Sequence, residues 1–337
     1  METKESKLPS DEPEQLMVKS QENTDNSYGC DPFKRDIVTL LDYGVINIDK
    51  PSGPTSHEVV SWVRKILNIE NAGHGGTLDP KVTGVLPCAL GRATRVLSAL
   101  LSAGKEYIGI LNLHKVEPLK KIEKIFKAFT GKIYQTPPIK SSVLRKLRIR
   151  EIYYIKLLEL KENNVLFQVG CEAGTYIRKL CFDIGEALCS GAHMLELRRT
   201  RVGAFREDNS LVSLQNLKDA YSIYLEENEE KYLRNILFPM ERMVEHLPKI
   251  YVRDSAVDAL CHGANLAAAG ICYIDARIDV NTQVALMTLK KELIGFGIAR
   301  LNAMKIYKAK SGIMVNSSKI FMERGVYPNW KTFKTKV

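Results

Sequence analysis

The sequence predicts an α+β fold with one large mixed domain and a second, smaller domain made mainly of β-strands. Before Leu247, apolar residues fall partly on helical stripes and partly in strand-length runs, which is typical of mixed α+β domains. After Pro248, short strand-like runs follow one another. The 337-residue chain is 45% hydrophobic and 26% charged, so its composition is that of a globular protein with a sizeable core.

Residues 1–30 are expected to form a disordered acidic and polar tail. This stretch holds seven acidic residues against three lysines and is nearly free of aromatic residues, so it cannot bury enough surface to offset its chain entropy. Its net charge of −4 leaves +14 on the rest of a chain whose total is +10. The folded part is therefore strongly basic. A basic surface favours polyanions such as RNA or DNA, although many basic proteins bind neither.

The large domain is expected over residues 31–247. It begins with a strand at 44–49 and a helix whose first turn has the capping-box spacing of Thr55 and Glu58. A glycine-rich loop at 72–80 follows. The remaining expected elements are a helical run at 96–101, strands at 105–113, 152–160 and 165–171, and a helix at 175–190.

The small β-rich domain, which could be a barrel, is expected over residues 248–324, with a short basic tail at 325–337. A brief helix at 254–262 ends at Gly263, because glycine readily adopts the left-handed conformation that closes a helix. Short strands are expected at 270–275, 283–289, 293–300 and 305–315.

Seven scattered cysteines without a C-x-x-C pair predict a reduced intracellular protein with no zinc site. A polar N-terminus without an apolar signal segment agrees with this interpretation. No run of about 18 apolar residues predicts a membrane span.

Asp79 is the candidate catalytic carboxylate. The glycines before it let the backbone approach a ligand closely, and Pro80 holds Asp79 in an extended conformation. The alternative is an Asp-Pro turn without chemistry, since both residues are common in turns. Arg178 is expected in the first turn of a helix, where a cation opposes the helix dipole. A buried Asp79 paired with it would compensate and stay ionised, whereas the alternative is that Arg178 points into water.

A basic stretch and one histidine are further candidates. Lys140, Arg145, Lys146, Arg148 and Arg150 lie within eleven residues that contain no acid, and in a strand Lys146, Arg148 and Arg150 share one face. This pattern fits a track for RNA phosphates, or equally a solvated edge strand protected by charge. His74 is a candidate base or base-pair probe, but a lone histidine in a glycine loop is more often a local hydrogen-bonding group.

Four segments together resemble the TruB family of pseudouridine synthases. They are GVINIDKP at 44–51, GHGGTLDPKVTG at 73–84, GKEYIG at 104–109 and AGTYIRKLCFD at 173–183. The resemblance covers residues 30–330 and implies a catalytic domain with a mixed, mainly antiparallel sheet, followed by a C-terminal PUA domain, a small RNA-binding β-barrel. One departure is Gly75, where the family usually has Ser or Thr.

The resemblance also implies roles for individual residues. Asp79 would be the nucleophile or would assist glycosidic cleavage, with Arg178 as its partner. Tyr107 would stack on the flipped base and take part in deprotonation at C5. Tyr176 and Leu197 would line the substrate pocket, with His74 near the displaced strand and Lys50 supporting the loops or a phosphate. Gly263 of the PUA domain would bind RNA. The reaction needs neither cofactor nor metal.

Within the family, the chain is most similar to the H/ACA (dyskerin-like) branch. Tyr107 and Pro137 are only thirty positions apart, without the long insertion of bacterial tRNA-specific members, and RKLRIR at 145–150 resembles the guide-dependent branch. This implies a nuclear, nucleolar catalytic subunit that works with an H/ACA guide RNA, substrate rRNA and small core proteins. The alternatives are a stand-alone tRNA uridine-55 synthase and a non-catalytic RNA-binding scaffold.

Overall fold

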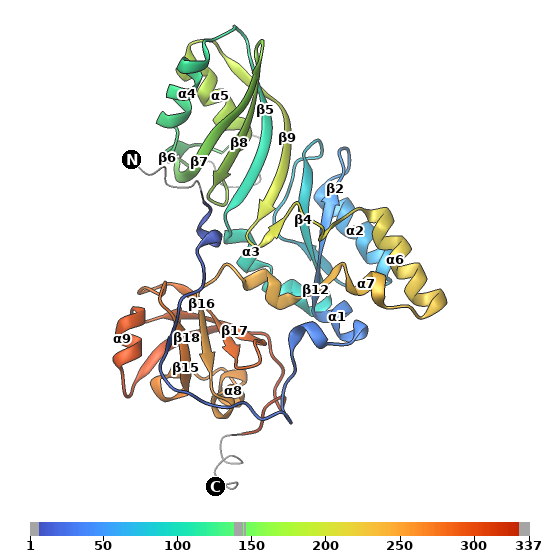
Figure 1. Ribbon diagram of the computed structural model, residues 1–337, viewed down its shortest axis with the longest axis vertical. Helices are drawn as coiled ribbons and strands as arrows, with labels where there is room; N and C mark the ends of the chain where they lie inside the picture. Colours follow the sequence, from blue (N-terminus) through green and yellow to red (C-terminus); the bar gives the residue numbers. More distant parts are fainter. Residues whose placement is uncertain (1–6, 138–143, 145, 330–337) are drawn as a thin grey trace. The chain divides into compact units, whose positions relative to one another are not determined.

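The computed structural model describes residues 7–137, 144 and 146–329, and divides into two compact units. The first unit comprises residues 1–12 and 46–236, and the second comprises residues 13–45 and 237–337. Figure 1 shows the first unit as a long twisted sheet with helices and the second as a small β-rich body. The α+β class with a smaller β-rich domain is therefore confirmed.

The sheet of the first unit is mainly antiparallel, as expected. Its central strand β5 (Lys105–Leu113) pairs antiparallel with β8 (Asn164–Cys171) on one side and with β9 (Ala192–Val202) on the other. Parallel pairs join β9 to β4 (Thr83–Leu90), and β11 (Leu211–Val212) to β2 (Gly44–Lys50). The other strands are β7 (Arg148–Lys161), which pairs with β8 and β6 (Gly131–Gln135), and the short β3 (Ala72–His74) and β10 (Phe205–Arg206), which pair with β4 and β9.

Helices of the first unit bury apolar faces against this sheet. The predicted capping box is present at α2 (Ser56–Leu67), where Thr55 and Glu58 satisfy each other's backbone amides. Side chains of α4 (Leu119–Ala128) and α5 (Ile177–Leu188) share one core with β5 and β8. The expected run at 96–101 divides into a 3-10 turn at Gly91–Val96 and α3 (Ser98–Ser102). The remaining helices are α6 (Leu214–Glu227) and α7 (Lys231–Arg234).

The second unit contains a seven-stranded sheet in the order β1-β15-β13-β16-β17-β18-β14. Its helix α8 (Asp254–Cys261) ends as predicted before Gly263, whose φ of +86° is left-handed. The other elements are β1 (Leu16–Val18), α1 (Ile37–Tyr43), β12 (Leu237–Pro239), β13 (Lys249–Val252), β14 (Leu266–Ala267), β15 (Ile271–Asp275), β16 (Gln283–Thr288), β17 (Leu293–Ala299), α9 (Ala303–Lys308) and β18 (Ile313–Ile320).

The predicted strand at 305–315 is wrong in its first half. Residues 303–308 form α9, because the side chain of Asn302 accepts a hydrogen bond from the amide of Lys305 and caps the helix. Ala303 and Ile306, one helical turn apart, are buried in the core. The strand of this region, β18, begins only at Ile313.

The N-terminal tail is ordered over residues 7–30, so the prediction of disorder is wrong for this range. β1 pairs antiparallel with β15 and extends the sheet of the second unit. The ammonium of Lys19 donates to three carbonyl oxygens at the C-terminal end of α9 at 2.5–3.0 Å. Few apolar residues are needed, because a sheet edge and a helix end supply backbone partners that offset the chain entropy.

The compact units are divided at other positions than the predicted domains, because residues 31–45 and 237–247 belong to the second unit. The guanidinium of Arg35 makes two 2.9 Å hydrogen bonds to the carboxylate of Glu241, which also accepts the amide of Leu293 at 3.0 Å. The expected C-terminal tail is partly packed as well. Tyr327 is buried and donates its hydroxyl to Glu292 at 2.7 Å. Among the described residues, no helix is long and apolar enough to cross a membrane.

Candidate active site

Asp79 lies on a loop that is anchored on both sides. Before it, Leu78 donates its amide to the hydroxyl of Ser56 at 2.9 Å, and its carbonyl accepts that hydroxyl at 3.2 Å. After it, the fully buried Lys50 donates to the carbonyl oxygens of Pro51, Pro80 and Val82, each at 2.9 Å. Lys50 thus supports the loop, whereas Ser56 was not identified from the sequence. Both side chains bind backbone atoms of residues beside Asp79, so they fix the loop without contacting the Asp79 carboxylate.

Arg178 contacts Asp79 across ninety-nine positions of the chain. Its guanidinium donates to the Asp79 carboxylate from the first turn of α5. The carboxylate supplies negative charge near the helix N-terminus and so offsets the cost of a cation there. The side chain of Asp79 is 55% exposed and that of Arg178 is 62% exposed, so the expected burial of Asp79 is wrong. The loop places the Asp79 carboxylate at the surface, where it is accessible to a substrate.

Tyr107 lies in the core beside a buried arginine. It is 8% exposed, and its register partner across β5 and β9 is Arg199, whose guanidinium charge acts on the Tyr107 hydroxyl. Burial raises the pKa of Tyr107, Arg199 lowers it, and the charge of Asp79 raises it slightly, which places the three groups within electrostatic reach. Leu78 and Ile177, the neighbours of Asp79 and Arg178, share one buried core with Tyr107, so the three candidate catalytic residues Asp79, Tyr107 and Arg178 belong to one site.

Arg199 is a site residue that the sequence reasoning missed. It is 1% exposed and donates to the carbonyl oxygens of Val85 at 2.8 Å and Gly76 at 3.0 Å, which ties the glycine-rich segment to β9. Burial lowers the pKa of this guanidinium. Adjacent arginines at 198 and 199 were the available signal, although no strand was predicted there, because one of two neighbours in a strand points to the buried face.

Gly84 explains the close approach of β4 to β9. Its φ is +101°, and a Cβ atom there would lie 2.2 Å from the carbonyl oxygen of Arg199. A side chain at this position would push the two parallel strands apart. The Thr83-Gly84 part of the motif therefore serves the packing around Arg199.

His74 lies in β3 at the edge of the site. Its Nδ1 accepts the amide of Gly76 at 3.4 Å, and its ring meets that of His57 edge-on with centroids 5.0 Å apart. Burial, followed by His57 and Arg199, lowers the pKa of His74 to about 4. The ring is therefore neutral at physiological pH. This fits a local hydrogen-bonding group, and its predicted contact with RNA stays a prediction.

The lowered pKa of His74 predicts a pH dependence of stability. In the unfolded chain a histidine titrates near its ordinary value of about 6.5, so between about pH 6.5 and 4 the unfolded state binds the proton and the folded state does not. The His74 contribution to the free energy of unfolding should decrease as the pH falls through this window. Following the ring by NMR should give a midpoint near 4, and the His74→Gln variant should show a flatter pH dependence. A midpoint near 6.5 would contradict this.

The two predicted pocket residues lie close to the catalytic groups. Tyr176 precedes α5, and its backbone amide and carbonyl are both bound by the buried side chain of Gln135, at 3.0 and 3.2 Å. Gln135 was not identified from the sequence. Leu197 lies on β9 opposite Gly109, and it packs half-buried against the core that contains Tyr107.

Two of the three basic side chains that were predicted to contact RNA already have partners within the chain. Lys146 is exposed, but Arg148 donates to the carbonyl of Leu144 at 3.3 Å, and Arg150 contacts Glu172 at 3.4 Å. Gly263 is exposed, with open space around its Cα. Their binding of RNA stays a prediction. Lys140 and Arg145 lie outside the described residues.

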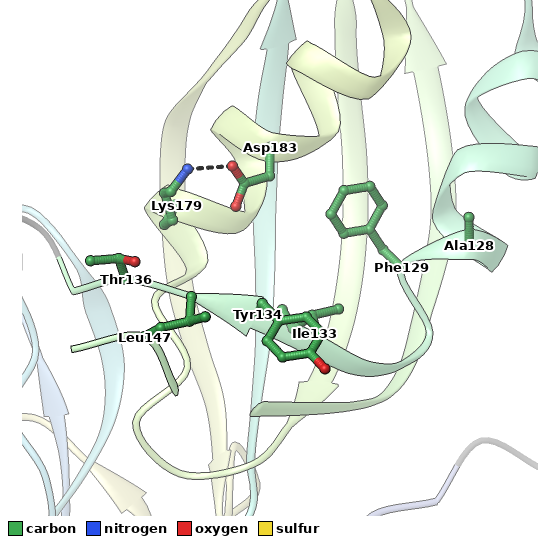
Figure 2. Close-up of a pocket in the computed structure, with 8 residues that line it drawn as sticks. All are labelled: Ala128, Phe129, Ile133, Tyr134, Thr136, Leu147, Lys179 and Asp183. Carbon is green, nitrogen blue, oxygen red and sulfur yellow. Dashed lines mark hydrogen bonds and ion pairs between the residues drawn. The ribbon is translucent and has the colours of Figure 1, made fainter. Parts of the chain in front are cut away.

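A cavity of about 370 Å³ lies between α5 and β6 of the first unit, and none of the predicted site residues lines it. Figure 2 shows the ion pair of Lys179 and Asp183 on α5 above Tyr134 of β6. The cavity is therefore not the candidate active site. In the described part of the chain, no three His, Cys, Asp or Glu side chains are grouped to hold a metal ion.

The chain matches four protein-family models, two of which cover the candidate catalytic residues. Residues 64–118 and 114–177 match the TruB family pseudouridylate synthase N-terminal domain, and residues 178–245 match the tRNA pseudouridylate synthase B C-terminal domain. Residues 248–321 match the PUA domain, and residues 5–60 match the DKCLD (NUC011) domain. The three candidate catalytic residues fall within the two synthase regions.

Individual relatives match nearly the whole chain. The chain is 51% identical to a probable tRNA pseudouridine synthase B of Methanopyrus kandleri, covering 98% of both chains, and 53% identical to one of Methanosarcina barkeri, covering 97% of both. The solved structure of a Cbf5-Nop10-Gar1 complex matches with a TM-score of 0.93 and 51% identity, over 96% of this chain and 99% of that one. That of an H/ACA RNP bound to a substrate RNA containing 2′-deoxyuridine matches with a TM-score of 0.90 and 49% identity, again over 96% and 99%. The chain belongs to the TruB family of pseudouridine synthases and carries a C-terminal PUA domain.

Proposed function

We propose that this protein is the catalytic subunit of an H/ACA ribonucleoprotein that isomerises guide-selected uridines in rRNA to pseudouridine. The observation that carries the proposal is the match over 96% of the chain to a protein solved in an H/ACA RNP bound to a substrate RNA. The match to a chain of a Cbf5-Nop10-Gar1 complex supports small core proteins as partners. Ribosome biogenesis and a nuclear, nucleolar location are part of the proposal.

The geometry suggests how the residues share the work. The reaction breaks the bond from C1′ to N1 of uridine, turns the uracil and joins C1′ to C5, so that C5 loses a proton and N1 gains one. Asp79, exposed and paired with Arg178, is available as the carboxylate that assists cleavage or attacks the nucleotide. When Tyr107 takes part in removing the C5 proton, the guanidinium of Arg199 stabilises its phenolate.

A stand-alone tRNA synthase is the second candidate, because curated relatives carry the name probable tRNA pseudouridine synthase B. Such an enzyme would act on a tRNA stem-loop without guide RNA or partners. The interval of thirty positions between Tyr107 and Pro137 leaves no room for the long insertion of tRNA-specific members. A non-catalytic scaffold is disfavoured, because Asp79, Tyr107 and Arg178 are all present and lie within one site.

The release of tritium from RNA labelled at uridine C5 tests these alternatives. Purified protein would be assayed alone on tRNA, and again with an H/ACA guide RNA, a matching substrate and the core proteins. Release only in the assembled complex supports the guided enzyme. Release by the protein alone on tRNA supports the second candidate, and no release with RNA still bound supports the scaffold.

Neutralising Lys146, Arg148 and Arg150 together is expected to weaken RNA binding and flatten its salt dependence. Each lost phosphate contact should reduce the slope of log K against log salt by about 0.7 to 0.9. The change would be measured by binding titrations at several salt concentrations. A matched variant with Lys120, Lys124 and Lys127 of α4 neutralised removes the same charge from another exposed surface. Equal effects of both variants would contradict a specific track and favour a solvated strand.

A further inference from the structure

The N-terminal residues Leu8–Asp11 form a turn that packs against the sheet of the first unit. Leu8 is 1% exposed, and with Pro9 it lies over Gly104, where a Cβ atom would be 3.6 and 3.7 Å from their side chains. Asp11 accepts the amide of Leu8 at 2.9 Å, which closes the turn. Figure 1 shows this dark-blue turn beside the ends of β5 and β9, the strands that carry Tyr107 and Arg199.

Asp11 connects this turn to β9 through an ion pair. Its carboxylate lies 2.6 Å from the guanidinium of Arg201 and 2.9 Å from that of Arg206. Arg201 also donates to the hydroxyl of Ser10 at 3.0 Å and to the carbonyl of Gly203 at 2.9 Å. Because the side chain of Arg201 is only 8% exposed, solvent screens these contacts weakly.

The strand β9 is irregular at the point where the turn holds it. Glu106 of β5 is the register partner of Arg201, whereas Tyr107 is already the partner of Arg199, so Thr200 is an extra residue in a β-bulge. Bulges redirect neighbouring side chains and are frequent beside active sites. Here the bulge immediately follows Arg199, the register partner of Tyr107.

A hydrogen-bond network fixes the bulge from the face of the sheet opposite to Tyr107. Successive residues of a strand point to opposite faces, so Glu106 points away from the catalytic side. Its carboxylate accepts the hydroxyl of Thr200 at 2.7 Å, the side-chain amide of Gln168 at 3.0 Å and the hydroxyl of Tyr154. The charges of Asp11 and Arg201 both act on Tyr154, so the N-terminal turn and the network are adjacent.

We infer that Leu8–Asp11 is a positioning element of the active site, which holds the β9 bulge through Arg201 and thereby aims Arg199 and Tyr107 at the substrate. The segment touches neither Asp79 nor Arg178 in any described contact, so it acts through the strands. The inference rests on the synthase activity of the family and not on how the RNA is selected. Since misplacement of a reacting group by about 1 Å costs up to about 100-fold in rate, modest changes in the bulge should be measurable.

The test uses the full chain in the RNA context in which the wild-type protein is active. Asp11→Asn keeps the shape but removes the charge that holds Arg201. It is expected to lower kcat by about five- to tenfold while KM and the RNA dissociation constant change less than about twofold. Asp11→Glu should restore at least half of the rate. The matched control is Asp31→Asn, because Asp31 caps a short turn of the second unit without any described ion pair, and it should keep the wild-type rate.

Two results would overturn the inference. One is an unchanged kcat in Asp11→Asn together with a lower melting temperature, which would make the segment a stabiliser only. The other is additivity with Tyr107→Phe, because a residue that acts through the Tyr107 hydroxyl should have little further effect once that hydroxyl is gone. If Asp11→Asn does not fold, Arg206→Gln is the second variant, because it removes only the ion pair of Asp11 with the half-exposed Arg206. It should lower kcat by a smaller factor than Asp11→Asn and leave KM unchanged.

Discussion

Asp79→Asn is expected to lower turnover by about 10⁴-fold or more while RNA binding and the melting temperature stay close to those of the wild-type protein. The substitution removes the charge but preserves the shape of the side chain. The loop should keep its conformation, because Ser56 and Lys50 anchor it through backbone atoms of the neighbouring residues and not through the carboxylate. Single-turnover measurements of tritium release, together with RNA binding titrations, check the two parts separately.

The matched control for this prediction is Asp183→Asn. Asp183 pairs with Lys179 on α5, the helix that carries Arg178, so its loss breaks a carboxylate ion pair near the site without touching the proposed reaction. Full isomerisation by Asp79→Asn would remove this carboxylate from the mechanism. An equal loss in both variants would point instead to a general effect on α5.

Lys50→Met is expected to lower the free energy of unfolding by about 2 to 4 kcal/mol and to reduce turnover as well. Methionine has a similar length but cannot donate, so the carbonyls of Pro51 and Val82 lose a described partner and that of Pro80 keeps only the amide of Gly53 at 3.0 Å. A buried polar group left without a partner costs about 1 to 3 kcal/mol. The loop that presents Asp79 would then lose part of its support. Urea unfolding and the turnover assay measure the two effects.

Lys81→Met supplies the comparison for Lys50→Met. Lys81 lies in the same loop but is exposed, so its replacement should leave both stability and turnover nearly unchanged. If Lys50→Met were as stable as the wild-type protein, the three hydrogen bonds would not hold the loop. If it were less stable but fully active, the loop would not depend on them for its catalytic conformation.

Sequence reasoning succeeded where the signal is local. The capping box of α2 depends on residues three positions apart, and the helix that places Arg178 in its first turn follows from one apolar stripe. The pairing of Arg178 with Asp79 was one of two alternatives left by the helix-dipole argument and was also implied by the family resemblance, and the structure confirms it. The exposure of Asp79 could not be predicted, because it depends on anchors that Lys50 and Ser56 supply from distant positions.

The residues that were missed are polar side chains with distant backbone partners. Arg199 is bound to Val85, more than one hundred positions away, and Gln135 is bound to Tyr176, forty-one positions away. Nothing local distinguishes such residues from solvated ones. The same holds for the N-terminal tail, whose composition predicts disorder, although a sheet edge encoded about 250 residues later makes it ordered. Composition describes what a segment can bury alone, and not what it can pair with.

The pairing of β1 with β15 has a consequence for the protein during its synthesis. Val18 leaves the ribosome long before its partner Tyr273, and translation at about 5 to 20 residues per second separates the two by roughly 13 to 50 s. Throughout this interval the nascent N-terminal strand β1 has no partner strand, and the sheet of the second unit is incomplete. The second unit is therefore completed late in biosynthesis, after residues 46–236 have been synthesised. For many seconds before that, the N-terminal strand is accessible to proteins that bind nascent chains.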